Sequence, residues 1–322
     1  MAVYTEISDE ELDALLDQYD LGQALSCKGI AEGVENSNFL LHTDAGYYIL
    51  TLYEKRVSKP DLPFFLGLME HLATHGFISP TPITAADGET LKEVAGRPAA
   101  IIEFLDGRSV KRVYPQHCAL LGETLAQLHT IGSNGFDLTR ANTLSLSSWR
   151  SLFESCAASH HGELHPEVFS EIESEISYLE SHWPKKLPSG VIHADLFPDN
   201  IFFLNDQVSG VIDYYFACND FFAYDVAICL NAWCFESDDS FNITKARKLL
   251  IGYRGIRDIS EEELNFLPLL CRGAAIRFLL TRLYDWLNQI EGALVKPKDP
   301  LEYFRKLQFH QAVKTVASYG LD

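Results

Sequence analysis

The sequence predicts an α+β protein with two lobes: a small antiparallel β-sheet with one packed helix, followed by a larger, mainly helical lobe. Three observations support this prediction. Runs of β-forming residues joined by turn signals fill the first hundred residues. After Asp106-Gly107 the pattern changes to long segments with helical spacing. A single short hairpin pattern, at residues 201–212, interrupts these helices. The predicted lobes are residues 1–105 and 106–322.

The N-terminal lobe opens with a helix. Ser8 and Glu11 form a capping box, and an apolar stripe of leucines follows it. Further elements are predicted from turn residues and apolar spacing. They are a hairpin of strands 38–43 and 47–53 around Asp44-Ala45-Gly46, a helix at 66–75 that ends at Gly76, and strands at 91–94 and 98–104.

The C-terminal lobe is predicted to be helical outside the hairpin. Ser260 and Glu263 form a second capping box. The predicted helices are 116–129, 149–159, 166–182, 222–235 and 244–253, followed by two helices between Ser260 and the 290s.

Composition narrows the class of protein. The 322 residues are 47% hydrophobic, enough for a large core, and the net charge of −19 argues against nucleic acid or an anionic membrane as partner. The acidic N-terminus does not resemble a signal peptide, and no apolar run approaches the length of a membrane span. The seven cysteines lack a CxxC pair, which favours reduced thiols and a cytoplasmic location. No signal indicates an oligomer, so a monomer is assumed.

The segment Val191–Asp213 is the most informative part of the chain. Val191-Ile192 is predicted to end a buried strand, and the loop after it carries His193, Asp195 and Asn200. If the hairpin turn centres near Asp206, Asn200 and Asp213 face each other, close enough for an amide oxygen and a carboxylate to share Mg²⁺.

Asp195 is the candidate catalytic base. A loop Asp, an Asn after four intervening residues and a second Asp beyond a hairpin are the order found in phosphotransferases. Asp195 would accept a proton from a hydroxyl nucleophile, while Asn200 and Asp213 hold the metal. The alternative is that these residues only form turns and cap a strand. His193 is expected to fix the loop by hydrogen bonding.

A glycine-containing turn precedes the first hairpin. Its backbone N–H groups and polar side chains could cover the phosphates of ATP. An ordinary loop would have a similar composition. The candidate residues are Gly29, Gly33, Asn36, Ser37 and Asn38.

Long stretches of the chain resemble the aminoglycoside phosphotransferase-like superfamily, which has a protein kinase-like fold, and within it the bacterial homoserine kinases. The narrower resemblance lies in residues 29–41, 48–56, 62–69, 213–219 and 223–235. It implies transfer of the γ-phosphate of ATP, with Mg²⁺, to the side-chain hydroxyl of L-homoserine in threonine biosynthesis. It also implies that adenine meets Glu103–Leu105 and that Asp225 braces the catalytic loop.

One position departs from the kinase pattern. The third strand of kinases usually carries a lysine that holds the phosphates, and here that position falls near Thr51. Lys55 and Arg56 lie just beyond and could substitute, or could simply be solvated. Glu70 is the candidate acidic partner, or a surface charge.

The acceptor site needs a cation for the substrate carboxylate. Arg277 and Arg282 on an apolar helix are candidates, although either could pair with an internal carboxylate. Asn231 and Trp233 are further candidates for the pocket. Two other functions remain open: a kinase for choline or an aminoglycoside, and a catalytically silent nucleotide-binding protein.

Overall fold

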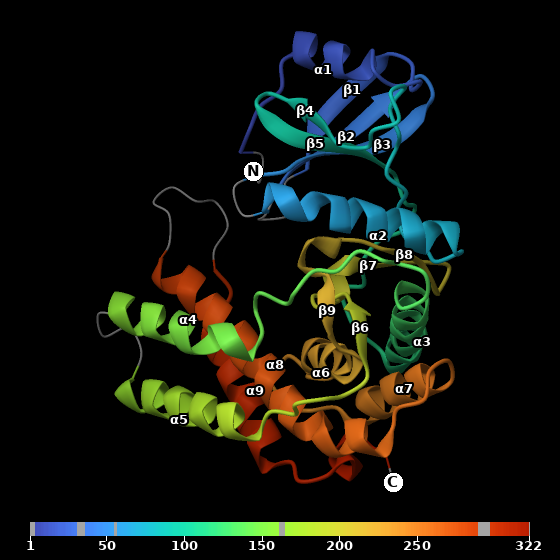
Figure 1. Cartoon of the computed structure of the whole chain (residues 1–322). Coiled ribbons are helices and arrows are strands. Elements are labelled where there is room, and N and C mark those ends of the chain that lie inside the picture. The colour runs from blue at the N-terminus through green and yellow to red at the C-terminus, as the bar shows by residue number, and fades with distance from the viewer. Residues whose placement is uncertain (1–3, 31–35, 55–56, 161–164, 289–296, 322) are drawn as a thin grey trace. The chain divides into compact units, whose positions relative to one another are not determined.

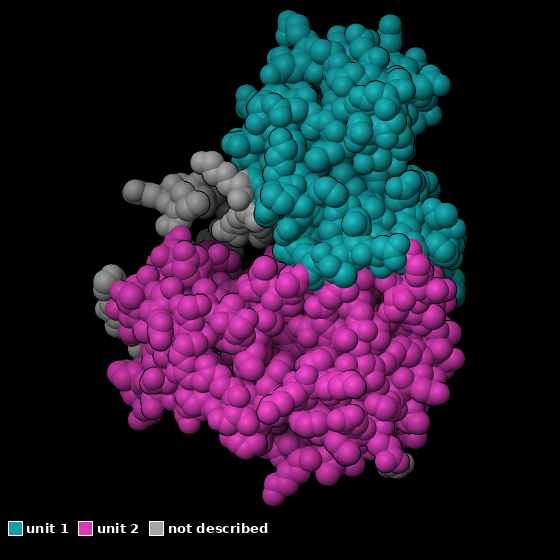
Figure 2. All heavy atoms as spheres, viewed as in Figure 1, with its two compact units in different colours: residues 1–108, 136–140, 202–215 teal, residues 109–135, 141–201, 216–322 magenta. Residues whose placement is uncertain are grey.

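The computed structural model describes residues 4–30, 36–54, 57–160, 165–288 and 297–321, and the chain divides into two units (Figure 2). Unit 1 contains residues 1–108, 136–140 and 202–215. Unit 2 contains residues 109–135, 141–201 and 216–322. A single boundary after residue 105 did not anticipate the two later segments of unit 1.

Unit 1 is built on a five-stranded antiparallel sheet in the order β1-β2-β3-β5-β4 (Figure 1). The hairpin predicted around Asp44-Ala45 is confirmed, with Thr43 paired to Gly46 across the turn. The strands are β1 (Ala24–Gly29), β2 (Ser37–Thr43), β3 (Gly46–Leu52), β4 (Lys92–Val94) and β5 (Arg97–Glu103).

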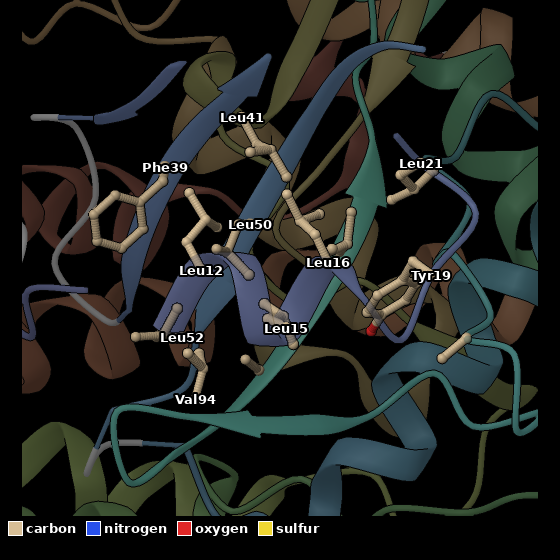
Figure 3. Close-up of a cluster of buried hydrophobic side chains, with 13 residues drawn as sticks. Leu12, Leu15, Leu16, Tyr19, Leu21, Phe39, Leu41, Leu50, Leu52 and Val94 are labelled. Carbon is tan, nitrogen blue, oxygen red and sulfur yellow. The ribbon is translucent and has the colours of Figure 1, made fainter. Parts of the chain in front are cut away.

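The helix α1 (Asp9–Leu16) covers one face of this sheet (Figure 3). Its predicted capping box is present, with Ser8 and Glu11 bonded in both directions. Buried and half-buried residues alternate along β2, so one side of the strand faces the helix. The core between them contains Leu12, Leu15, Leu16, Phe39, Leu41, Leu50 and Leu52.

The second helix of unit 1, α2 (Leu62–Thr74), begins earlier than the predicted residue 66. A 3₁₀ turn at Lys59–Asp61 leads into it, and Pro63 occupies its first turn, where a missing N–H costs little. The helix ends as predicted before Gly76, which has φ +79°.

The hairpin of β7 (Ile201–Leu204) and β8 (Gln207–Val211) turns at Asn205 and Asp206, whose φ angles are 50° and 60°. Positive φ at both positions is typical of a tight two-residue turn. The middle of β7 exchanges main-chain hydrogen bonds with Arg108, and Val211 N–H donates to Ile78 O at 2.9 Å. These bonds explain why residues 202–215 belong to unit 1, a grouping that local patterns do not reveal.

Unit 2 is mainly helical, as predicted. Its helices are α3 (Pro115–Gly132), α4 (Leu146–Ser159), α5 (Pro166–His182), α6 (Phe222–Trp233), α7 (Ile243–Arg254), α8 (Glu261–Leu287) and α9 (Pro300–Ala312). A short strand, β6 (Ser189–Ile192), pairs antiparallel with β9 (Cys218–Phe221), which was not predicted. All seven cysteines are free thiols.

The prediction of two helices after Ser260 was wrong, because α8 is one continuous helix with Pro268 inside it. Buried side chains such as Leu267 and Leu270 flank the proline, so core packing outweighs the missing hydrogen bond. By length and composition α8 could cross a membrane, but 67% of its most apolar window is buried. It is therefore a core helix of unit 2.

The helices α3 and α7 pack closely, and each has a glycine at the crossing. A Cβ atom on Gly122 would lie 2.1 Å from Leu249 O, and one on Gly252 would lie 2.2 Å from Ala119 O. Both obstacles are main-chain atoms, which cannot move aside as a flexible side chain could. The two glycines therefore set the distance between these helices.

Gly252→Ala should lower the free energy of unfolding by about 1–3 kcal/mol, because the added methyl group forces two backbones apart. Urea unfolding would measure this. The matched control is Gly67→Ala in α2, where a Cβ atom would meet nothing closer than Leu138 Cδ1 at 3.4 Å. That variant should be more stable by about 0.5–1 kcal/mol. Wild-type stability in the Gly252 variant would contradict the prediction.

Candidate active site

The loop after β6 brings Asp195 and Asn200 together within unit 2. Asn200 Nδ2 donates to the main-chain O of Asp195 at 2.8 Å and lies 3.4 Å from the Asp195 carboxylate. Because the nitrogen and the oxygen of an amide lie on separate arms of one plane, a bond from Nδ2 to the Asp195 carbonyl leaves Asn200 Oδ1 turned away from that carbonyl. Asp195 is half-buried and Asn200 buried, so both side chains are held in place.

The backbone just before Asp195 has an uncommon conformation. Ala194 has φ 63°, a region that residues other than glycine rarely occupy. The fully buried Asp225, on α6, holds this turn: its carboxylate accepts from His193 N–H at 2.7 Å and from Ala194 N–H at 3.0 Å. The expected brace is therefore confirmed. Asp195 N–H also lies 3.3 Å from His193 Nδ1, which agrees with the loop-fixing role predicted for His193.

Asp225 also bonds to His129 of α3, whose Nε2 lies 3.1 Å from Asp225 Oδ2. Burial lowers the pKa of His129 below its ordinary value, against the opposing effect of Asp225. Burial acts to raise the pKa of Asp225, but the hydrogen bonds from His129 and from the His193 main chain help bring that pKa below its ordinary value. The pair is therefore a neutral imidazole and an ionised carboxylate at neutral pH.

Two further side chains bind the carbonyl groups of the loop. Arg277 of α8 donates from Nη1 to Ala194 O, and Trp233 of α6 donates from Nε1 to Leu196 O at 2.8 Å. The segment around Asp195 is thus bonded to α6 and α8 through both its N–H and its C=O groups. A base held on such a frame keeps one orientation.

Two of the predicted acceptor residues make hydrogen bonds within unit 2. Asn231 is fully buried and its Nδ2 donates to Ala227 O and Cys271 O, so it links α6 to α8. Trp233 is 1% exposed and its indole N–H binds the loop. Contact of either residue with a substrate stays a prediction. Arg282 is ion-paired with Glu302 at 2.6 Å and stacks on Tyr303.

Asp213 belongs to unit 1, whereas Asn200 belongs to unit 2. The predicted pairing of Asn200 with Asp213 across the hairpin was wrong, because the turn lies at Asn205-Asp206 and β8 ends at Val211. Asp213 lies beyond the paired strand and has φ 66°, again uncommon for a residue other than glycine.

The residues that follow the glycine-containing turn are tied to the protein. Ser37 is fully buried; its hydroxyl donates to Glu54 Oε1 at 2.8 Å and accepts from the N–H of Tyr4 and of Thr5. Asn36 is 2% exposed, and its Oδ1 accepts from Glu54 N–H at 3.3 Å. These two side chains are bonded to Glu54, so the segment that follows the turn is fixed, and contact of either with a phosphate stays a prediction.

The other residues predicted to lie near the phosphates of ATP have the following surroundings. Gly29 ends β1. Asn38 accepts a hydrogen bond at Oδ1 from the Thr51 hydroxyl at 2.8 Å, and Thr51, where kinases usually have lysine, is 1% exposed. Glu70 is exposed on α2, as a surface charge would be. Gly33, Lys55 and Arg56 lie outside the described residues.

Glu54, just after β3, is a residue that sequence reasoning missed. Its carboxylate accepts from the hydroxyl groups of Ser37 and Thr5 and forms an ion pair with Arg97 Nε at 3.1 Å. No local motif identifies it, because its partners come from β2, β5 and the N-terminus. The one signal in the sequence is a charged residue close behind an apolar strand, which can indicate that the charge is buried.

A pocket of about 400 Å³ lies on unit 1 beside the segment predicted to meet adenine. It is lined by Leu40, Tyr47, Phe104 and Asp106. Tyr47 stacks on His42 with ring centroids 4.1 Å apart, and Tyr47 and Phe104 are partly exposed apolar rings. A hollow lined by two aromatic rings suits a planar heterocycle.

Asp225→Asn should lower the free energy of unfolding by about 3 kcal/mol or more, because an amide NH₂ would face main-chain donors that now bind a carboxylate. Chemical unfolding followed by circular dichroism measures the loss. The exposed Asp258 offers the control Asp258→Asn, which should change stability little. Equal stability of both variants would show that Asp225 does not hold the loop.

Comparison with known proteins adds independent information. A model of the phosphotransferase enzyme family matches residues 26–259. The homoserine kinase of Bradyrhizobium diazoefficiens is 62% identical over 322 residues, covering 100% of this chain and 98% of its own. The homoserine kinase of Paramagnetospirillum magneticum is 59% identical over 328 residues, covering 100% of both chains.

Solved structures with little sequence similarity share the fold. An amicoumacin kinase in complex with AMP-PNP and Ca²⁺ has a TM-score of 0.70 at 15% identity, covering 95% of this chain and 94% of its own. A microcompartment-associated aminopropanol kinase has a TM-score of 0.62 at 16% identity, covering 98% and 99%. The predicted kinase-like α+β fold is confirmed. The chain belongs to the phosphotransferase enzyme family and is similar along its whole length to homoserine kinases.

Proposed function

We propose that this protein transfers the γ-phosphate of ATP to the side-chain hydroxyl of L-homoserine, giving O-phospho-L-homoserine and ADP. The observation that carries the chemistry is the loop of Asp195 and Asn200, bonded together and braced by Asp225. The identity of about 60% to homoserine kinases over the full chain supports the acceptor. The reaction is a step toward threonine, in the cytoplasm, where free thiols persist.

Asp195 acts as the general base. The homoserine hydroxyl oxygen forms a bond to the γ-phosphorus while the bond from that phosphorus to the β,γ-bridging oxygen breaks, and the hydroxyl proton passes to the Asp195 carboxylate. In a loose transition state the proton leaves late, so the orientation of Asp195 matters more than its basicity. A base fixed through the main chain on both sides meets that requirement.

The candidates for holding Mg²⁺ are Asn200 of unit 2 and Asp213 of unit 1, each judged by its own donor chemistry. An amide oxygen and a carboxylate suit a hard cation, and the bond from Asn200 Nδ2 to Asp195 O leaves the Asn200 oxygen directed away from the loop carbonyl. The cation would neutralise negative charge on the phosphates. The constrained backbone at Asp213, with φ 66°, fixes the start of its side chain.

Residues 1–105 would cover the nucleotide, and residues 106–322 would supply the catalytic and acceptor groups. Adenine would lie in the pocket of Leu40, Tyr47 and Phe104, against the main chain of Glu103–Leu105. Since Glu103 N–H already donates to Thr81 O at 2.9 Å, Glu103 would contribute its carbonyl. Gly29, Gly33 and Lys55 remain the candidates for the phosphates.

Arg277 is the better candidate for the homoserine carboxylate. Arg282 already has a carboxylate partner in Glu302, whereas Arg277 makes no ion pair with the described residues. Arg277 also binds the carbonyl of Ala194, next to Asp195, which places a cation beside the base.

The decisive assay is ADP release with Mg-ATP and a panel of L-homoserine, L-serine, choline and kanamycin. L-homoserine should give the highest kcat/KM, and Asp195→Asn and Asp213→Asn should each lower kcat by about 100-fold or more. The control is Asp199→Asn, an exposed residue of the same loop, which should keep wild-type kcat. A preference for another acceptor would replace the substrate but keep the mechanism. No turnover with any acceptor would favour the silent nucleotide-binding protein.

Glu54→Gln should raise KM for ATP about tenfold and leave KM for homoserine nearly unchanged, because it loosens the anchor of the glycine-containing turn. Steady-state kinetics with each substrate varied in turn would measure both constants. Glu93→Gln is the control, since within the described part of the chain Glu93 on β4 forms an ion pair only with Lys59, exposed and at 3.9 Å. Equal changes in both KM values would contradict a role confined to the nucleotide.

A further inference from the structure

The bracing of the catalytic loop extends beyond Asp225 and His129 through a chain of hydrogen bonds within unit 2. His129 Nδ1 lies 2.7 Å from the hydroxyl of Tyr253 on α7. That hydroxyl accepts from Arg257 Nη1 at 3.1 Å. His129, Asp225 and Tyr253 are fully buried, so these bonds do not compete with water.

The chain has one consistent direction. Asp225 is an ionised acceptor, so the proton of the neutral His129 ring must lie on Nε2. His129 Nδ1 is then an acceptor, and the Tyr253 hydroxyl is its donor. The oxygen of Tyr253 in turn accepts from the guanidinium of Arg257, which is always charged. Every member therefore donates toward Asp225.

Packing and further bonds hold the middle and the far end of this series of hydrogen bonds. The glycine crossing of α3 and α7 brings Gly252, the neighbour of Tyr253, against Ala119 of the helix that carries His129. At the far end, Arg257 Nη2 binds Glu263 Oε1 at 3.0 Å, and the other oxygen of Glu263 caps α8 through Ser260. Arg257 also lies over the ring of Phe222, with its guanidinium 4.4 Å from the centroid.

We propose that Tyr253 and Arg257 are positioning residues for phosphoryl transfer. Tyr253 donates to His129 Nδ1 and Arg257 donates to Tyr253, so the His129 ring is held from the side opposite Asp225 with its Nε2–H directed at that carboxylate. Asp225 in turn holds the turn of His193 and Ala194 that orients Asp195. Without the Tyr253 hydroxyl, the ring is held on the Asp225 side alone, its bond to Asp225 weakens, and so does the support that Asp225 gives the loop.

This inference rests on the proposed function for its kinetic part. Tyr253→Phe removes only the hydroxyl and should lower kcat about tenfold to 100-fold, with KM for ATP and for homoserine changed less than about twofold. Proton and nitrogen NMR of protein with labelled histidine should show His129 protonated on Nε2, with the Nε2–H proton resonance shifted upfield in the variant because its hydrogen bond to Asp225 weakens. His129→Gln identifies the signal.

The protein contains a second buried tyrosine–histidine pair that serves as a matched control. Tyr319 binds His310 Nδ1 at 2.8 Å, both residues are fully buried in unit 2, and the catalytic loop makes no hydrogen bond to either among the described residues. Tyr319→Phe should lose similar stability but keep wild-type kcat. Equal losses of kcat in both variants, or wild-type kcat and an unchanged His129 Nε2–H resonance in Tyr253→Phe, would overturn the proposal.

Two further results keep the test decisive. If Tyr253→Phe does not fold, Arg257→Gln takes its place, since Arg257 is at the partly exposed end; it should lower kcat, and Arg257→Lys should restore part of it. If the wild type does not phosphorylate homoserine, the proposed function fails. The Nε2–H resonance of His129 needs no substrate and still decides whether Tyr253 supports the bond from His129 to Asp225.

Discussion

The active-site loop depends on one buried carboxylate. Asp225 is ionised in the core of unit 2 and accepts three hydrogen bonds, two of them from successive main-chain N–H groups before Asp195. Burying a charge is costly unless donors surround it, and here the donors are the loop itself and His129. The loop supplies N–H donors that stabilise the charge of Asp225. The same hydrogen bonds offset the cost of the φ angle of 63° at Ala194.

The proposed base and the segment after the glycine-containing turn are held in different ways. In unit 2, the residues on either side of Asp195 are bonded through their main chain to side chains from α6 and α8. In unit 1, Ser37 and Asn36 are bonded to Glu54. As the proposed base, Asp195 would have to meet a hydroxyl at one angle, which calls for a rigid support.

Predictions from the sequence were most reliable where all the residues that form a feature lie close together in the chain. The capping boxes at Ser8 and Ser260 and the hairpin turn at Asp44-Ala45 are contained within a few residues, and the structure has all three. The predicted register of the second hairpin was wrong. Its turn consists of Asn205 and Asp206, so β8 ends at Val211 and Asp213 lies beyond the paired strand. Core packing keeps α8 continuous through Pro268, an effect that local helix propensity does not include.

By itself the sequence determined the fold class and most of the elements, because spacing along the chain carries that information. The roles of Asp195, Asn200 and Asp213 rest on the same spacing and stay predictions. Tertiary structure alone decided how the other polar candidates are bonded: Asn231, Trp233, Asn36 and Ser37 each make hydrogen bonds within the protein that no local pattern predicts. Glu54 and Tyr253 look unremarkable, but each meets partners from distant segments, and a linear pattern does not record which segments meet.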